Sequence, residues 1–246
     1  SKYRRSFLGW AWSLLNPLSN MLIYTFVFGV VFGATAPIGK PSGLNVYALY
    51  LLCGILPWGF FSQVTILGMN ALLSNASLVR KVAFARETLV ISQVIFCFVQ
   101  WSIEMTLLAV ALIIAGSPII PWLPVTILLM VCLAVYAAGF ALALSAAAVF
   151  FRDLRYLWSI LVQVMFFATP IIYTPDRLEG KLPAAIDFIL TWNPMAVFIL
   201  TFRHMLYGGA APNWGEMLYV VVVSILVFIA GWAIFSRLSR RVAEEL

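Results

Sequence analysis

The chain has 246 residues, of which 64% are hydrophobic and 10% charged, whereas a soluble domain is about 45–50% apolar and about 25% charged. Fifteen Lys and Arg and nine Asp and Glu give a net charge of +6, too few charges to cover a water-soluble surface of this size. With a mean hydropathy of +1.04, the composition excludes a soluble enzyme, a disordered chain and a disulfide-stapled module; no nucleic acid partner is expected, because basic residues here first set membrane orientation.

The N-terminal segment 1–16 predicts an amphipathic helix at the membrane interface. Tyr3, Phe7 and Trp10 share one face, and polar residues occupy the opposite face. A basic cluster at its start can meet an anionic lipid or a phosphate, and it consists of Lys2, Arg4 and Arg5. The alternative is an orientation anchor and nothing more.

Six apolar stretches predict membrane-spanning helices, each of which needs about 20 apolar residues. They cover residues 18–34, 46–73, 89–116, 122–151, 157–172 and 217–235. Pro57 lies inside the second and Pro170 in the fifth, where we expect a kink or a stop. We therefore expect an all-α integral membrane protein forming a single transmembrane domain over residues 1–246, with five spans within 18–172.

Basic residues concentrate on one side of these spans. Alternate loops hold 11 of the 15 Lys and Arg, in the segment before the first span, the two loops around 80–86 and 152–155, and the tail 236–246. The positive-inside rule makes this side cytoplasmic. A multi-pass protein with both termini in the cytoplasm follows.

The cytoplasmic loop after the second span predicts a short amphipathic helix. Its apolar residues Leu78 and Val79 stand beside the basic residues Arg80 and Lys81. Such a helix can dock in a partner's cleft, and the alternative is a solvated turn whose charges only orient the chain.

The external region 173–213 contains two apolar pieces, 184–190 and 195–206, each too short to cross a bilayer. Asn193-Pro194 separates them. We expect an outer pair of re-entrant or interfacial helices before the sixth span.

No catalytic, cofactor or metal site is predicted. His204 is the one histidine and has no Cys, Asp or Glu at ligand spacing. The glycines of residues 33–41 do not form a nucleotide-binding loop, because Pro41 stands where Ser or Thr must bind magnesium.

Two intramembrane features can carry function. Gln93, Gln100 and Glu104 form one stripe of the third span, which fits either proton coupling or a structural hydrogen bond. Aromatic residues of the first and fifth spans pack against lipid by default but can also stack on sugar rings. They are Tyr24, Phe28, Phe32, Trp158, Phe166, Phe167 and Tyr173.

The order of several short motifs resembles the membrane subunits of ABC-2 type polysaccharide exporters, the permeases of O-antigen, teichoic acid, capsule and galactan precursors. The motifs are Tyr3-Arg4-Arg5-Ser6, Trp12-Ser13-Leu14-Leu15-Asn16-Pro17, Tyr24-Thr25-Phe26-Val27-Phe28, Arg86-Glu87, Phe151-Arg152-Asp153, Thr169-Pro170-Ile171-Ile172-Tyr173, Trp192-Asn193-Pro194-Met195 and Phe202-Arg203.

The resemblance implies a homodimer in a bacterial plasma membrane, joined to two copies of a separate ATPase subunit that binds ATP and magnesium. By this analogy the interfacial helix, residues 78–81 and Arg86-Glu87 receive the ATPase's motion, and the first and fifth spans line the pore. The cargo would be a glycan on an undecaprenyl diphosphate carrier, whose diphosphate the N-terminal basic cluster can pair with. The alternatives are an ABC-2 drug or lipid exporter and a proton-coupled secondary transporter that uses Glu104.

Overall fold

The computed structural model describes residues 36–81, 85–173 and 192–245, together with 19, 22, 23, 26, 27, 31 and 33. These residues form helices and connecting loops, and none of them is in a strand. The predicted interfacial helix 1–16, most of the first span and the apolar piece 184–190 lie outside the described residues.

Four helices of the described part are long and apolar enough to cross a membrane. They are α2 (Tyr47–Ser74), α4 (Glu87–Ile114), α5 (Leu123–Phe150, continuous with the short η3, Ile120–Trp122) and α9 (Trp214–Glu245). These helices coincide with the second, third, fourth and sixth predicted spans. Pro57 does not stop α2, which continues through it over 28 residues.

The fifth predicted span, 157–172, corresponds to a short helix that starts three residues earlier and ends before Pro170. Helix α6 runs over Leu154–Ala168, 15 residues, which at 1.5 Å per residue is about 22 Å, less than the roughly 30 Å of a bilayer core. It ends before Pro170 because Thr169 adopts an extended conformation, with φ −100° and ψ 137°, as expected of a residue that precedes proline. The short stretches α3 (Ala76–Lys81) and α8 (Pro194–Phe202) complete the described helices together with the π-helical turn η5 (Arg203–Tyr207).

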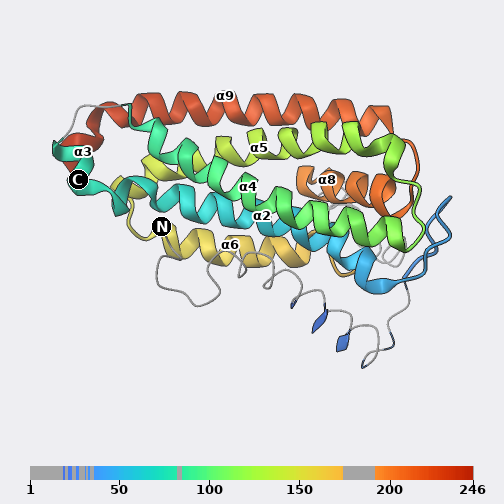
Figure 1. The fold of residues 1–246 in the computed structure, drawn as a ribbon. Helices are drawn as coiled ribbons and strands as arrows, with labels where there is room; N and C mark the ends of the chain where they lie inside the picture. Colours follow the sequence, from blue (N-terminus) through green and yellow to red (C-terminus); the bar gives the residue numbers. More distant parts are fainter. Residues whose placement is uncertain are drawn as a thin grey trace.

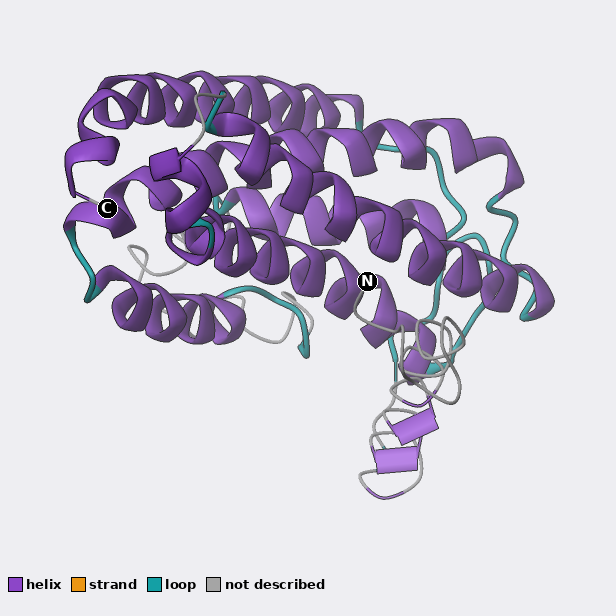
Figure 2. Ribbon diagram, turned by 60° about the vertical axis from the view of Figure 1, so that its left-hand side comes forward, coloured by secondary structure: helices purple, strands orange, loops and turns teal. Residues whose placement is uncertain are grey.

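The long helices form an elongated bundle (Figures 1 and 2). Helix α9 packs along one side of α5, and α2 packs along another side; α4 lies against α2, and α6 contacts both α2 and α5. In Figure 1, α3, the α5–α6 connection and the C-terminal part of α9 lie at the left end, called here the α3 end. The loops that precede α2, follow α4 and precede α9 lie at the opposite end, called here the η5 end.

The centre of the bundle consists of α2 and α5, which are buried over most of their length, whereas α4 and α9 are largely exposed. Leu226 and Ile229 of α9, for example, are 60% and 58% exposed. Such apolar exposure suits contact with lipid. An α-helix pairs most of its backbone polar groups internally, which a membrane requires.

Glycines bring α5 and α9 into close contact. A Cβ at Gly139 would lie 2.5 Å from the carbonyl oxygen of Val227, and a Cβ at Gly231 would clash with the backbone of Gly139. Small residues of this kind allow membrane helices to approach closely. The separation between α5 and α9 therefore depends on these two glycines.

We expect Gly139→Ala to destabilise the bundle by about 1–3 kcal/mol, because the added methyl group overpacks the α5–α9 contact. The measurement is the free energy of unfolding of the purified chain in detergent, followed by circular dichroism. Gly59→Ala is the matched control, because a Cβ at Gly59 meets nothing within 4 Å. Equal stability of the two variants would contradict the proposed role of Gly139.

Candidate functional site

The stretch α8–η5 begins at a side-chain cap and is too short to span a membrane. Asn193 caps the helix, and its Oδ1 accepts a hydrogen bond from the backbone N–H of Met195 at 3.0 Å. Pro194 occupies the first helical position, where its missing N–H costs nothing. The break predicted at Asn193-Pro194 is therefore the start of this helix.

Arg203, at the junction of α8 and η5, is buried, with 5% of its surface exposed. Its guanidinium donates hydrogen bonds to the carbonyl oxygens of Tyr50, at 3.2 Å, of Pro170, at 2.5 Å, and of Ile171. The same group lies over the ring of Tyr50, 3.9 Å from its centroid. One side chain thus joins η5 to the start of α2 and to the segment that follows α6.

The charge of Arg203 is not neutralised by any carboxylate that the structure describes within ion-pair distance. Burial lowers the pKa of its guanidinium, and the neighbouring Tyr50 partly offsets this effect. The group nevertheless remains charged, because arginine is not deprotonated in proteins. Its energetic support comes from carbonyl dipoles and an aromatic face.

Space for this guanidinium is provided by Gly54 on α2. A Cβ at Gly54 would lie 2.8 Å from Nη2 of Arg203. Any larger residue would displace the side chain that the three carbonyls hold.

Further contacts tie both ends of α8–η5 to the surrounding loops. Asn193 donates to the hydroxyl of Thr169, after α6, at 3.1 Å. The hydroxyl of Tyr207 bonds to the carbonyl of Leu44 at 2.9 Å and receives the N–H of Val46 at 3.2 Å. Ser117, after α4, donates to the carbonyl of Leu206 at 2.7 Å. The η5 end is therefore organised around this stretch.

Arg203 is named from the sequence only within the motif Phe202-Arg203, and its structural role is not predicted there. The available signal was its position inside the apolar piece 195–206. An ionisable residue within an apolar segment is expected to face protein and to find partners. The identity of those partners required the fold.

The aromatic residues predicted on the fifth span do not share one environment. Trp158 is buried against Phe140, with ring centroids 5.7 Å apart, whereas Phe167 is 64% exposed. Phe166 is half-buried and packs edge-on against Trp58. Tyr173, also half-buried, donates to the carbonyl of Phe167 at 3.2 Å.

The loop residues predicted to contact an ATPase lie at the α3 end. Leu78 on α3 is 43% exposed; Val79, Arg80 and Lys81 belong to the same helix. Arg86 donates a hydrogen bond to the carbonyl of Ser239 on α9, and Glu87 begins α4. The loop before α4 is thereby attached to the last helix.

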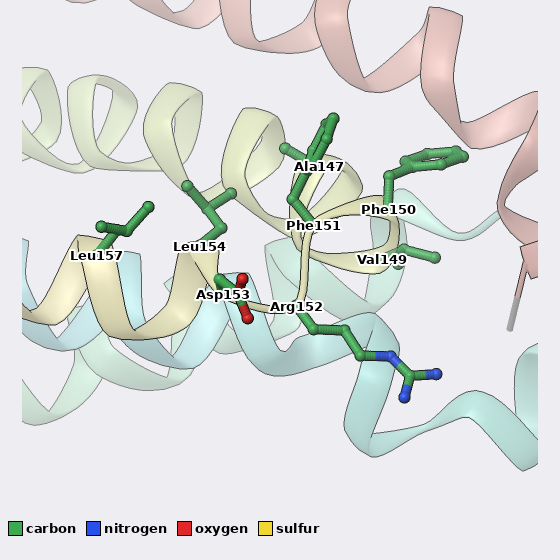
Figure 3. Close-up of a pocket in the computed structure, with 8 residues that line it drawn as sticks. All are labelled: Ala147, Val149, Phe150, Phe151, Arg152, Asp153, Leu154 and Leu157. Carbon is green, nitrogen blue, oxygen red and sulfur yellow. The ribbon is translucent and has the colours of Figure 1, made fainter.

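The α5–α6 connection borders an open cleft of about 710 Å³ at the same end (Figure 3). Phe151 is 68% exposed there. The side chain of Arg152 extends away from Leu154 and Leu157 (Figure 3). This surface combines an exposed aromatic ring with exposed charges.

The polar stripe on α4 contains one hydrogen bond within the helix. Gln100 donates to Glu104 over 3.5 Å, and both side chains are half-buried. Six predicted site residues lie outside the described residues: Lys2, Arg4, Arg5, Tyr24, Phe28 and Phe32.

Long apolar helices, close glycine packing and a loop-rich end held by a buried arginine define an integral membrane protein with several α-helical spans. The family model described as ABC-2 type transporter matches residues 1–207. This chain belongs to that family.

Curated relatives align with 93–100% of the chain. The O-antigen export system permease protein RfbA of Klebsiella pneumoniae is 28% identical over 246 residues, covering 100% of this chain and 90% of the relative. RfbA of Myxococcus xanthus is 28% identical over 250 residues, covering 100% and 91%. The polysialic acid transport protein KpsM of Escherichia coli is 20% identical over 234 residues, covering 93% and 85%.

We expect Arg203→Met to lower the free energy of unfolding by about 2–4 kcal/mol, because three carbonyl groups lose a charged donor. Amide hydrogen exchange should accelerate in residues 169–173 and at the start of α2. Arg203→Lys should recover only part of the loss, since an ammonium cannot reproduce the planar fork.

Arg152→Met is the control for this experiment, because Arg152 is exposed. Unfolding and exchange in the control should match the unsubstituted protein. Unchanged exchange at 169–173 in Arg203→Met would contradict the role assigned to the guanidinium.

Proposed function

We propose that this chain is the membrane-spanning permease subunit of an ATP-driven polysaccharide exporter. The observation that carries the proposal is its membership of the ABC-2 type transporter family, together with full-length similarity to two O-antigen permeases and similarity over 93% of the chain to a polysialic acid transport protein. Energy would come from ATP hydrolysis on a separate subunit, to which magnesium and nucleotide belong.

The assembly we propose is a homodimer of six-span chains with two ATPase copies, in the plasma membrane of a bacterium. The cytoplasmic side would be the α3 end, because Arg86, Arg152, Arg155 and Arg237 lie in its loops or at the adjoining helix ends. Lys40 and Arg203 belong to the η5 end, which would face outwards. Both termini are then cytoplasmic.

The cargo we propose is a glycan on an undecaprenyl diphosphate carrier. Lys2, Arg4 and Arg5 would engage the diphosphate on the cytoplasmic side, since basic side chains bind phosphate through charge-assisted hydrogen bonds. The stretch α8–η5 would belong to an outer re-entrant pair that closes the path.

The exposed face of α6 supports a path between two copies. Its apolar residues recur at helical spacing, as Leu157, Ile160, Leu161, Val164 and Phe167. Among the aromatic residues predicted on this segment, Phe166, Phe167 and Tyr173 are exposed or half-buried and could contact a sugar ring. Trp158 is buried and would instead stabilise the packing of α6.

Two alternative functions are a drug or lipid exporter of the same family and a proton-coupled transporter. An ABC-2 drug or lipid exporter would share the family but not the cargo of the named relatives. Proton coupling would use Glu104, which bonds to a neutral Gln100 on its own helix. That contact favours a structural hydrogen bond over a proton relay.

We expect Leu78→Asp to abolish polysaccharide export in cells that also express the ATPase subunit. A charge at an apolar docking position should weaken ATPase binding by about tenfold or more, as measured by copurification and by ATPase activity of the complex. Leu78→Met should retain both. Normal export and copurification in Leu78→Asp would refute docking through α3, and ATP hydrolysis by the purified chain alone would refute the proposed division of labour.

We expect Phe167→Ala to reduce export by about fivefold, because aromatic stacking contributes about 1 kcal/mol or more per ring. Phe167→Trp should preserve export. Ile229→Ala serves as the control, since Ile229 is comparably exposed but lies on α9. Equal export by Phe167→Ala and the control at equal expression would remove Phe167 from the path.

A further inference from the structure

A cavity of about 520 Å³ opens at the η5 end beside Arg203. Its wall combines the segment before α2, the start of α2, the turn η5 and the start of α9. The ionisable and amide side chains among its lining residues are Lys40, Tyr50, Arg203, His204, Tyr207, Asn213 and Glu216. A pocket of this size accommodates a small polar ligand.

The positive charges of this cavity exceed the negative ones. Lys40 is exposed, and neither Lys40 nor Arg203 forms an ion pair with a residue that the structure describes. Glu216 instead lies beside neutral partners: Asn213 donates to its Oε1 at 3.1 Å, and the hydroxyl of Thr201, which also donates to Val197, lies 3.3 Å from its Oε2. Two cations therefore face one carboxylate that is already hydrogen-bonded.

Arg203 also retains donor capacity. Three of its N–H groups bond to carbonyl oxygens of the described residues, and a guanidinium has five. Burying a cation without a counter-charge is unfavourable, and the three carbonyls supply dipoles but no negative charge. An anion in the adjoining cavity would complete the electrostatics of the site.

We propose that this cavity binds a phosphate group through Lys40 and Arg203. A phosphate offers several acceptor oxygens to the arginine fork and to the lysine ammonium. The proposal rests on the proposed function in one respect: the phosphate source would be the diphosphate of the polyprenyl carrier after it reaches the outer leaflet. Lys40 and Arg203 would then form a receiving site separate from Lys2, Arg4 and Arg5.

The test measures binding of undecaprenyl diphosphate to the full chain in phosphatidylcholine nanodiscs. Lys2, Arg4 and Arg5 are first replaced by Gln, so that the N-terminal basic cluster does not contribute. In this background Lys40→Gln should weaken binding by about tenfold, the effect of one charge-assisted contact. Lys40 is substituted rather than Arg203 because the latter also supports the fold.

A second substitution is expected to change the binding affinity in the opposite direction. Glu216→Gln should tighten binding severalfold, because it removes the negative charge and keeps an oxygen for Asn213. Arg237→Gln is the control for Lys40→Gln, since Arg237 is exposed near the far end of α9 and its loss lowers the net charge by the same amount. A purely structural role for the cavity would not produce a gain in affinity.

Inorganic pyrophosphate distinguishes the two sources of phosphate. If pyrophosphate competes, the site recognises the phosphate group alone. If pyrophosphate does not compete but binding of the lipid still depends on Lys40, the site recognises the lipid-borne phosphate. The proposal is overturned if the background variant binds neither probe, if Lys40→Gln and Arg237→Gln bind equally, or if a neutral polysaccharide alone competes. If the chain binds the probe and depends on Lys40 and Glu216 as expected but exports no polysaccharide, the proposed function is refuted and the phosphate site is retained.

Discussion

The η5 end depends on one cation that three backbone carbonyls hold away from water. Pro170 forces Thr169 into an extended conformation and so ends α6 early. The carbonyls of Pro170 and Ile171 then lie outside the helix and need donors, which a bilayer does not supply. Arg203 provides these donors from a helix distant in sequence. The carbonyl groups freed at the end of α6 thus accept hydrogen bonds from the buried guanidinium, and the guanidinium obtains its acceptors from them.

The two ends of the molecule are connected through α9. At the η5 end, Glu216 of α9 lies 3.3 Å from the hydroxyl of Thr201 of α8. At the α3 end, Ser239 accepts a hydrogen bond from Arg86, which precedes α4. Close glycine contact holds α9 against α5 between these points. Helix α9 is therefore attached to other elements at both ends and along its length, and a displacement of the α3 end would act on it.

Composition and apolar length predicted much of the fold, because spanning helices need little beyond continuous hydrophobicity. The fifth span was placed three residues too late at its start, since its first turn at Leu154 and Arg155 contains a charge that hydropathy counts against a helix. Its end at Thr169 followed from proline chemistry. The four spans of the described part needed no knowledge of tertiary structure.

The site was less accessible to sequence reasoning, because Arg203 joins residues that lie 32 to 153 positions away from it in the chain. Arg203 meets carbonyls of Tyr50 and Ile171, and a carbonyl acceptor carries no side-chain signature. The buried position of Trp158 beside the exposed Phe167 likewise depends on which face of α6 meets α5. Aromatic composition identified both residues but could not separate their environments.

The anchoring of the first described loop has a consequence for biogenesis. Residues 37–46 are fastened by Tyr207, which lies 161 to 170 positions later in the chain. During synthesis, α2 and α4 can enter the membrane long before the ribosome reaches that tyrosine. Insertion and final folding are then separate events, and the early loop must await the last quarter of the polypeptide before it acquires its native shape.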